Sequence, residues 1–136
     1  MLHIEHIGIA VKNMEVSQKL FTTLLNTSAY KDELVASEGV HTLFFRTGET
    51  KVELLAATNP ESPIAKFIEK KGEGIHHIAF AVKDIRAEMQ RLVAEGYVLL
   101  NTEPKKGADN KLICFLHPKN TNGVLIELCQ DNPDSN

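Results

Sequence analysis

The sequence contains little cysteine and no long apolar run. Cys114 and Cys129 are its only two cysteines, too few for the disulfide framework of a small secreted domain, so we expect free thiols in a reducing compartment. No apolar stretch approaches the roughly 20 residues that span a bilayer. Residues 1–4 are not the start of a basic segment followed by an apolar one, as a signal peptide would require. We therefore expect a cytoplasmic protein with no membrane partner.

Clustered positive charge is missing as well. The net charge is −3 and the longest basic run is a Lys-Lys pair, which argues against a nucleic-acid-binding surface. The 136 residues suffice for one domain with a real core and are too few for two ordinary ones. We expect a single domain over residues 1–136.

An internal repeat is the most informative feature that is present. Residues 6–14 read HIGIAVKNM, and residues 77–85, which lie 71 positions downstream (77 − 6), read HIAFAVKDI. Residues 52–55 read VELL, and residues 126–129, 74 positions downstream (126 − 52), read IELC. The nearly equal offsets indicate that one supersecondary unit occurs twice.

Each unit is predicted to be one strand, one helix and then further strands, a βαβββ module in an α+β fold. Asn13 and Asp84 are expected to cap the two module helices. In the first helix, Val16, Leu20 and Leu24 recur at helical spacing. The predicted elements are strands at about 3–11, 29–35, 40–47 and 51–57 in module one (about 1–59), a linker helix at about 62–71 that Pro63 begins, and strands at about 75–83, 97–101, 111–117 and 124–129 in module two (about 72–130).

Two histidines occupy equivalent places on the first strand of each module. Side chains alternate between the two faces of a strand, so His6 shares its face with Gly8 and Ala10, and His77 shares its face with two alanines. Small residues beside a polar one leave space for an ion and a ligand, whereas a face built only for packing would be filled.

Two glutamates, Glu53 and Glu127, lie between apolar neighbours on the last strand of each module. A carboxylate in such a place is costly to bury unless it is paired or bound to metal. A single strand histidine or glutamate is usually an ordinary core or surface residue, but the repeat requires one explanation for all four. We predict that His6, Glu53, His77 and Glu127 bind one divalent ion (cobalt, manganese, nickel or zinc), whose charge the two carboxylates balance.

The remaining histidines and Cys129 are given structural roles. His76 adjoins His77 but faces the other way along the strand. Cys129 shares the face of Glu127, where a small buried thiol is the ordinary interpretation. The histidines without a repeat partner are not expected to be ligands: His3, His41 and His117.

Paired βαβββ modules with His on the first strand and Glu on the last resemble the vicinal oxygen chelate superfamily, which includes glyoxalases, bleomycin resistance proteins and dioxygenases. Within it the chain is most similar to the methylmalonyl-CoA epimerase family. The matching stretches cover nearly the whole chain: HIGIAV at 6–11, KVELL at 51–55, SPIAKF at 62–67, GIHHIAF at 74–80, FLHP at 115–118 and GVLIEL at 123–128.

The resemblance implies an open, eight-stranded, U-shaped sheet around a metal site. His6, Glu53, His77 and Glu127 match the ligand positions of the family one by one. The implied activity is inversion at C2 of methylmalonyl-CoA through a metal-stabilised enolate, with Glu127 also one of the two acid–base groups. An acyl-CoA substrate follows from this, and a homodimer is left open.

The position at which the family carries its second acid–base group does not hold an acidic residue in this sequence. The family has an acidic residue two positions before the Gly or Lys that precedes the third strand; counted from Gly39, this is Ser37, and Glu38 follows it. We predict that an irregular backbone before Gly39 brings Glu38 to the site as the second catalytic group. Glu33 in the preceding strand is one alternative, and a different substrate without a second base is another.

Lys105 and Lys106, in a predicted loop after Pro104, are candidates to bind the phosphates of CoA. Lys111 and Lys119 are further candidates, and a solvated surface cluster is an equally good interpretation of these lysines.

Other functions stay open at this point. A glyoxalase I-type lactoylglutathione lyase would use the same four ligands and also shuttle a proton. A metal-free sequestering protein of the drug-resistance type would lack the ligand set. An extradiol dioxygenase fits least, because its iron site uses two histidines and one carboxylate.

Overall fold

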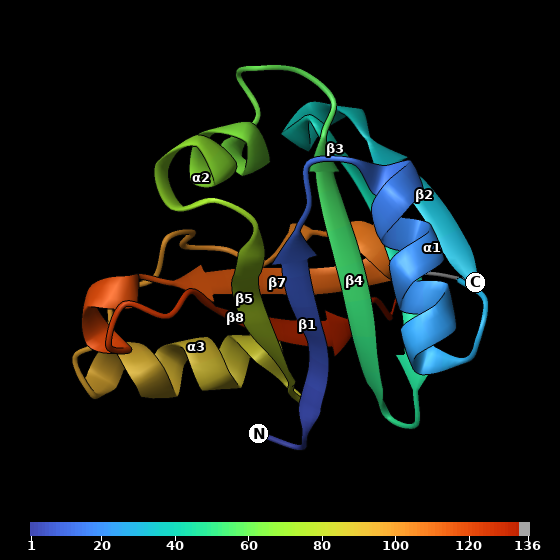
Figure 1. Cartoon of the computed structure of the whole chain (residues 1–136). Coiled ribbons are helices and arrows are strands. Elements are labelled where there is room, and N and C mark those ends of the chain that lie inside the picture. The colour runs from blue at the N-terminus through green and yellow to red at the C-terminus, as the bar shows by residue number, and fades with distance from the viewer. Residues whose placement is uncertain (134–136) are drawn as a thin grey trace. The chain divides into compact units, whose positions relative to one another are not determined.

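A computed structural model describes residues 1–133 of the chain (Figure 1). The described residues form three α-helices and eight strands, which confirms the α+β class. They divide into two compact units, one of residues 6–76 and one of residues 1–5 together with the chain from residue 77 onward.

The first unit contains one module and the linker helix. Its strands are hydrogen-bonded in the order β2-β3-β4-β1, with β4 parallel to β1 and antiparallel to β3. The elements are β1 (Ile4–Ala10), α1 (Met14–Leu25), β2 (Lys31–Val35), β3 (Val40–Thr47), β4 (Thr50–Ala57) and α2 (Pro63–Lys71).

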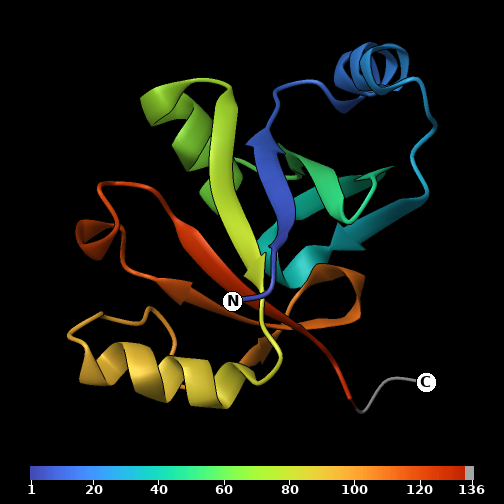
Figure 2. The same ribbon diagram turned by 90° about the horizontal axis from the view of Figure 1, so that it is seen from below.

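The second unit repeats this topology. Its strands follow the order β5-β8-β7-β6, with β8 parallel to β5 and antiparallel to β7. Figure 2 shows α3, coloured yellow, lying along β7 and β8. The elements are β5 (Gly74–Ala81), which begins within the first unit, α3 (Ile85–Ala94), β6 (Lys105–Lys106), β7 (Lys111–Leu116) and β8 (Ile126–Asp131). The duplication seen in the sequence is thus a duplication of strand order.

The caps of both module helices are those predicted. The Asn13 side chain accepts a hydrogen bond from the backbone N–H of Val16, and Asp84 accepts one from Ala87. These bonds satisfy N–H groups that have no partner within the helix.

The apolar positions singled out in α1 do not face the core. Val16, Leu20 and Leu24 are 60%, 55% and 67% exposed. The residues that pack on the buried cluster of β3 and β4 are instead Met14, Phe21 and Leu25. Both sets have helical spacing, so periodicity alone could not choose between them.

The strand predicted at 97–101 is not formed, and this prediction was wrong. Leu99 makes only an isolated bridge to Leu116. At Asn101 the side chain replaces the backbone in pairing with β7: its amide donates to the Ile113 carbonyl and its oxygen accepts from the Phe115 N–H. The edge strand of the unit is instead β6, at Lys105–Lys106, which follows the predicted range of 97–101.

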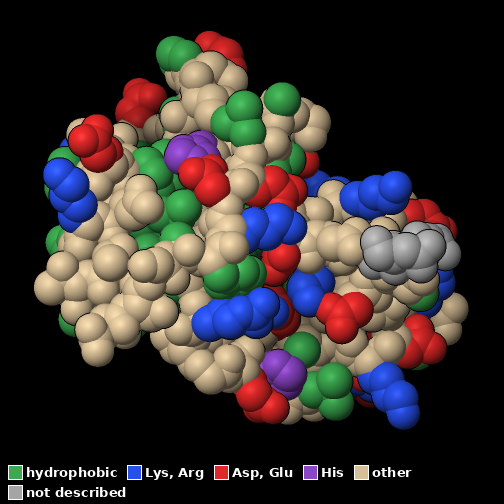
Figure 3. Space-filling view, turned by 90° about the vertical axis from the view of Figure 1, so that its right-hand side faces the viewer, with side chains coloured by type: hydrophobic (Ala, Val, Ile, Leu, Met, Phe, Trp, Pro, Cys, Tyr) green, Lys and Arg blue, Asp and Glu red, His purple; other side chains and the backbone are tan. Residues whose placement is uncertain are grey.

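No helix within residues 1–133 has the length and apolar character needed to cross a membrane. On the face drawn in Figure 3, side chains of Lys and Arg are interspersed with those of Asp and Glu.

Candidate metal centre

The first unit holds a buried histidine–glutamate pair. His6 on β1 and Glu53 on β4 are 4% and 5% exposed. The Nδ1 atom of His6 lies 3.0 Å from Oε2 of Glu53. In the parallel register, Gly8 is the residue paired with Glu53, so a glycine occupies the position beside the carboxylate, on the face that His6 also occupies.

The second unit holds the corresponding pair. His77 on β5 and Glu127 on β8 are each 5% exposed, and Nε2 of His77 lies 3.4 Å from Oε1 of Glu127. Here Ala79 is the residue paired with Glu127. In both units the small residue two positions after the histidine is therefore level with the carboxylate.

The donor set fits a divalent metal ion. Burial of a carboxylate away from water is strongly unfavourable unless a cation or hydrogen-bond donors compensate it. Each pair offers one imidazole nitrogen and one carboxylate, which are ligand types that first-row divalent ions use.

An aromatic side chain stands next to each carboxylate. Phe44 on β3 pairs with Glu53, and Phe115 on β7 pairs with Glu127. The Phe115 ring is edge-on to the His77 imidazole, with centroids 6.0 Å apart and an interplanar angle of 85°. These rings lower the local dielectric constant and so strengthen electrostatic interactions beside the two pairs.

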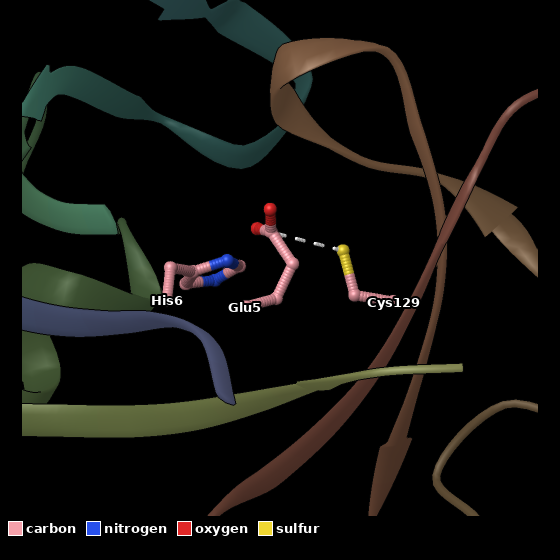
Figure 4. Close-up of side chains that lie close together, drawn as sticks. All are labelled: Glu5, His6 and Cys129. Carbon is pink, nitrogen blue, oxygen red and sulfur yellow. Dashed lines mark hydrogen bonds between the residues drawn. The ribbon is translucent and has the colours of Figure 1, made fainter. Parts of the chain in front are cut away.

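Glu5 is a buried carboxylate that the sequence reasoning missed. It is 6% exposed and accepts a hydrogen bond from the Cys129 thiol, with 3.9 Å between Sγ and Oε1 (Figure 4). The Nζ atom of Lys111 lies 3.9 Å from its other oxygen and also pairs with Asp131. An acidic residue directly before His6 in an otherwise apolar strand was the signal available in the sequence.

Lys111 has a structural role in this cluster. Burial by itself would lower the pKa of Lys111, but the hydrogen bond to Asp131 and the charge of Glu5 outweigh it and raise that pKa. The ammonium group therefore stays charged between two carboxylates, which does not fit the earlier suggestion that Lys111 binds a CoA phosphate. Cys129 is 1% exposed, the buried thiol that was expected.

Three of the other histidines have structural surroundings. The His76 ring packs edge-on against Phe67 of α2 at 4.9 Å, and burial together with the charge of Lys71 lowers the pKa of His76. His41 Nε2 lies 2.6 Å from the Asp32 carboxylate. His117 accepts a hydrogen bond from the backbone N–H of Lys119 and caps a single 3-10 turn.

The backbone before Gly39 is irregular, as predicted. Ala36–Glu38 form one turn of 3-10 helix, and Gly39 ends it in the left-handed region with φ 64°. Glu38 is exposed on this turn.

Glu33 lies on β2 instead and is half-buried. It pairs with Thr42, which pairs with Leu55, two residues from Glu53 on β4. Alternation therefore places Glu33 on the Glu53 face of the sheet.

Lys105 and Lys106 lie in a short strand and not in the predicted loop. In β6, Lys105 pairs with Ile113 and Lys106 with Leu112. The prediction of a loop was wrong. After Asn101, whose side chain takes the place of the backbone, the chain pairs with β7 again at these two lysines.

The chain thus consists of two βαβββ modules, and each module has a buried His–Glu pair on its first and last strands. Imidazole nitrogens and carboxylate oxygens are common metal ligands. Residues 5–115 match the family model described as Glyoxalase/Bleomycin resistance protein/Dioxygenase superfamily. The chain belongs to this superfamily, and the resemblance inferred from the sequence is confirmed.

Epimerases are among the similar proteins. An ethylmalonyl-CoA/methylmalonyl-CoA epimerase of Cereibacter sphaeroides is 40% identical over 129 residues, which cover 93% of this chain and 96% of the relative. The crystal structure of methylmalonyl-CoA epimerase from Mycobacterium tuberculosis matches with a TM-score of 0.91 and 32% identity, over 96% of this chain and 89% of that one. A methylmalonyl-CoA epimerase in complex with methylmalonyl-CoA and NH4+ matches with a TM-score of 0.90 and 30% identity, over 98% and 96%.

Proposed function

We propose that this protein is an epimerase that interconverts the (R) and (S) forms of methylmalonyl-CoA. The observation that carries the proposal is the repeat-related pair of buried His–Glu contacts, His6 with Glu53 and His77 with Glu127. The similarity to proteins named methylmalonyl-CoA epimerase supports it. A homodimer and a cytoplasmic location remain predictions.

The metal ligands in this proposal are His6, Glu53, His77 and Glu127, holding one divalent ion (cobalt, manganese, nickel or zinc). When bound, such an ion supplies Lewis acidity toward the oxygens of the thioester and of the free carboxylate. The two glutamates balance its charge, and the small residues Gly8 and Ala79 beside them leave room for a ligand.

Inversion at C2 requires a proton to leave one face of the carbon and another to arrive on the opposite face. We assign Glu127 to one face, where its carboxylate takes the C2 proton in one direction of the reaction and returns it in the other. Glu38 is assigned to the opposite face. The irregular turn that carries it supports this role, and Glu33 on the Glu53 face is the alternative carboxylate.

Lys105 and Lys106 are proposed as substrate-binding residues, because an acyl-CoA carries negative charge on its acyl carboxylate and on its phosphates. Phe115 would shield the reacting end from water beside His77.

Solvent exchange tests the proposal directly. The metal-loaded protein is incubated with methylmalonyl-CoA in deuterium oxide, and the product is analysed by mass spectrometry and NMR. Deuterium is expected at C2, because the proton passes through exchangeable carboxyl groups. A chelator should stop the exchange and added metal should restore it. Absence of exchange with fully metallated protein would overturn the proposal.

A further inference from the structure

A lysine stands over the aromatic ring beside each buried His–Glu pair. In the second unit, Nζ of Lys105 lies 5.7 Å from the centroid of Phe115. In the first unit, Nζ of Lys31 lies 5.9 Å from the centroid of Phe44. Both distances are within the roughly 6 Å over which an ammonium group is attracted to a ring face.

The two lysines have similar but not identical places in the two units: Lys31 pairs directly with Phe44, whereas Lys105 pairs with Ile113, two residues from Phe115. Lys31 and Lys105 are separated by 74 positions (105 − 31), as are Glu53 and Glu127 (127 − 53). The order glutamate, phenylalanine, lysine thus runs outward across neighbouring strands in both units, from β4 through β3 to β2 and from β8 through β7 to β6. In each unit a lysine on the edge strand therefore contacts the aromatic ring that neighbours the buried glutamate.

Strand alternation separates Lys105 from its neighbour Lys106. Lys105 pairs with Ile113, which is two residues from Phe115 and therefore on the same face as Phe115 and Glu127. Lys106 pairs with Leu112 and points to the opposite face. The two adjacent lysines are thus not equivalent, and only Lys105 shares the face of the buried pair.

Lys105 and His77 contact the same aromatic ring. The ammonium nitrogen of Lys105 is 5.7 Å from the Phe115 ring centroid, and that centroid is 6.0 Å from the centre of the His77 imidazole. Phe115 therefore connects the Lys105 ammonium group to the buried His77. The phosphates of CoA are attached at the far end of the pantetheine arm, well away from the thioester.

The charges of the proposed site call for a cation there. Glu53 and Glu127 already balance a divalent ion, so the free carboxylate of a malonyl-type substrate adds a negative charge to a largely buried region. An ammonium group nearby offsets that charge.

We propose that Lys105 recognises the free carboxylate of the acyl group and so selects 2-carboxyacyl thioesters over simple acyl thioesters. This inference rests on the proposed function and extends it to substrate selection. Lys31 is the corresponding edge-strand lysine of the other unit, and its Nζ lies 3.4 Å from the Glu33 carboxylate.

Binding of two thioesters that have no stereocentre to invert at C2 tests the assignment apart from turnover. Malonyl-CoA carries the carboxylate, whereas propionyl-CoA lacks it and has the same CoA phosphates. Dissociation constants for both are measured by calorimetry on the metal-loaded wild type and on Lys105→Met, Lys106→Met and Lys31→Met. Loss of a charge-assisted hydrogen bond predicts roughly tenfold or more weaker malonyl-CoA binding by Lys105→Met. The affinity of Lys105→Met for propionyl-CoA should be unchanged, which also shows that the variant is folded.

Three results would overturn the assignment. An equal loss of both ligands in Lys105→Met would place the contact at the phosphates. A loss confined to malonyl-CoA in Lys106→Met, as large as that in Lys105→Met, would contradict the separation of faces, since a phosphate contact of Lys106 would weaken both ligands alike. A larger loss of this kind in Lys31→Met would give the role to the other unit. Failure of the wild type to exchange deuterium into methylmalonyl-CoA would instead count against the proposed function, and the binding data would remain a separate measurement.

Discussion

The ammonium nitrogen of Lys111 on β7 lies 3.9 Å from a carboxylate oxygen of Glu5, the residue directly before His6. The backbone supports the same attachment, because Leu2 donates to the Ala81 carbonyl and Ala81 donates to that of His3, both at 2.8 Å. These contacts hold residues 1–5 to β5, β7 and β8. The proposed ligand His6 is the next residue in the chain.

Lys111→Met should lower the free energy of unfolding by about 1–3 kcal/mol, because it leaves the buried Glu5 carboxylate without its cation. Urea denaturation measures the change. The exposed Lys119→Met is the matched control and should stay within about 0.5 kcal/mol of wild type. Equal stability of the two variants would show that the Glu5–Lys111 contact contributes nothing.

Neighbouring histidines provide a test of the proposed metal centre. His77→Ala should lose most of the bound metal, since it removes one of four proposed ligands. His76→Ala should keep metal content near wild type, because that ring packs against Phe67. Elemental analysis of the purified variants decides, and equal metal loss in both would contradict the assignment of ligands.

Glu38→Gln should slow epimerisation by roughly 100-fold or more, the usual effect of removing an acid–base group, without loss of metal. Glu33→Gln is the comparison variant, since Glu33 shares the face of Glu53. Turnover rate and metal content are measured for both. A near-normal rate for Glu38→Gln with a slow Glu33→Gln would transfer the role to Glu33.

Adjacent residues of α1 should respond in opposite ways to substitution. Phe21→Ala should reduce the free energy of unfolding by about 2–3 kcal/mol, because the ring packs on the core formed by β3 and β4. Leu20→Gln, at a position that is 55% exposed, should change it by about 0.5 kcal/mol or less. Thermal and urea unfolding of both variants compare the two faces; a larger loss in Leu20→Gln would reverse the assignment.

The buried thiol of Cys114 should affect stability at alkaline pH. Burial raises its pKa from 9.0 to about 11. The unfolded chain then releases this proton first, so the folded state loses stability as the pH rises from about 9 toward 11. In a Cys129→Ser background, which leaves one thiol, thiolate absorbance should appear near pH 11 in the native protein and near pH 9 after unfolding. The same midpoint in both states would contradict the burial effect.

Local pattern and repetition were enough to predict much of this protein from its sequence. The sequence alone predicted the duplication, the helix caps Asn13 and Asp84, and the face shared by His6 and Gly8. Capping and strand alternation depend on residues that are close in the chain. The four proposed ligands could be read because two equivalent mid-strand carboxylates have no ordinary packing explanation.

Contacts between distant residues decided the rest. Helical spacing fits Leu20 as well as Phe21, and only the sheet beneath α1 selects which of them is buried. The Asn101 side chain takes backbone partners on β7, and the edge strand lies further along the chain at Lys105 and Lys106. Because these two lysines are adjacent in a strand, they point to opposite faces. Glu5 and Lys111 are far apart in the chain, and no local pattern pairs them. Local sequence patterns therefore indicate the modules and the candidate ligands. The charged side chains that lie beside those ligands depend on strand register and long-range contacts, which no local pattern specifies.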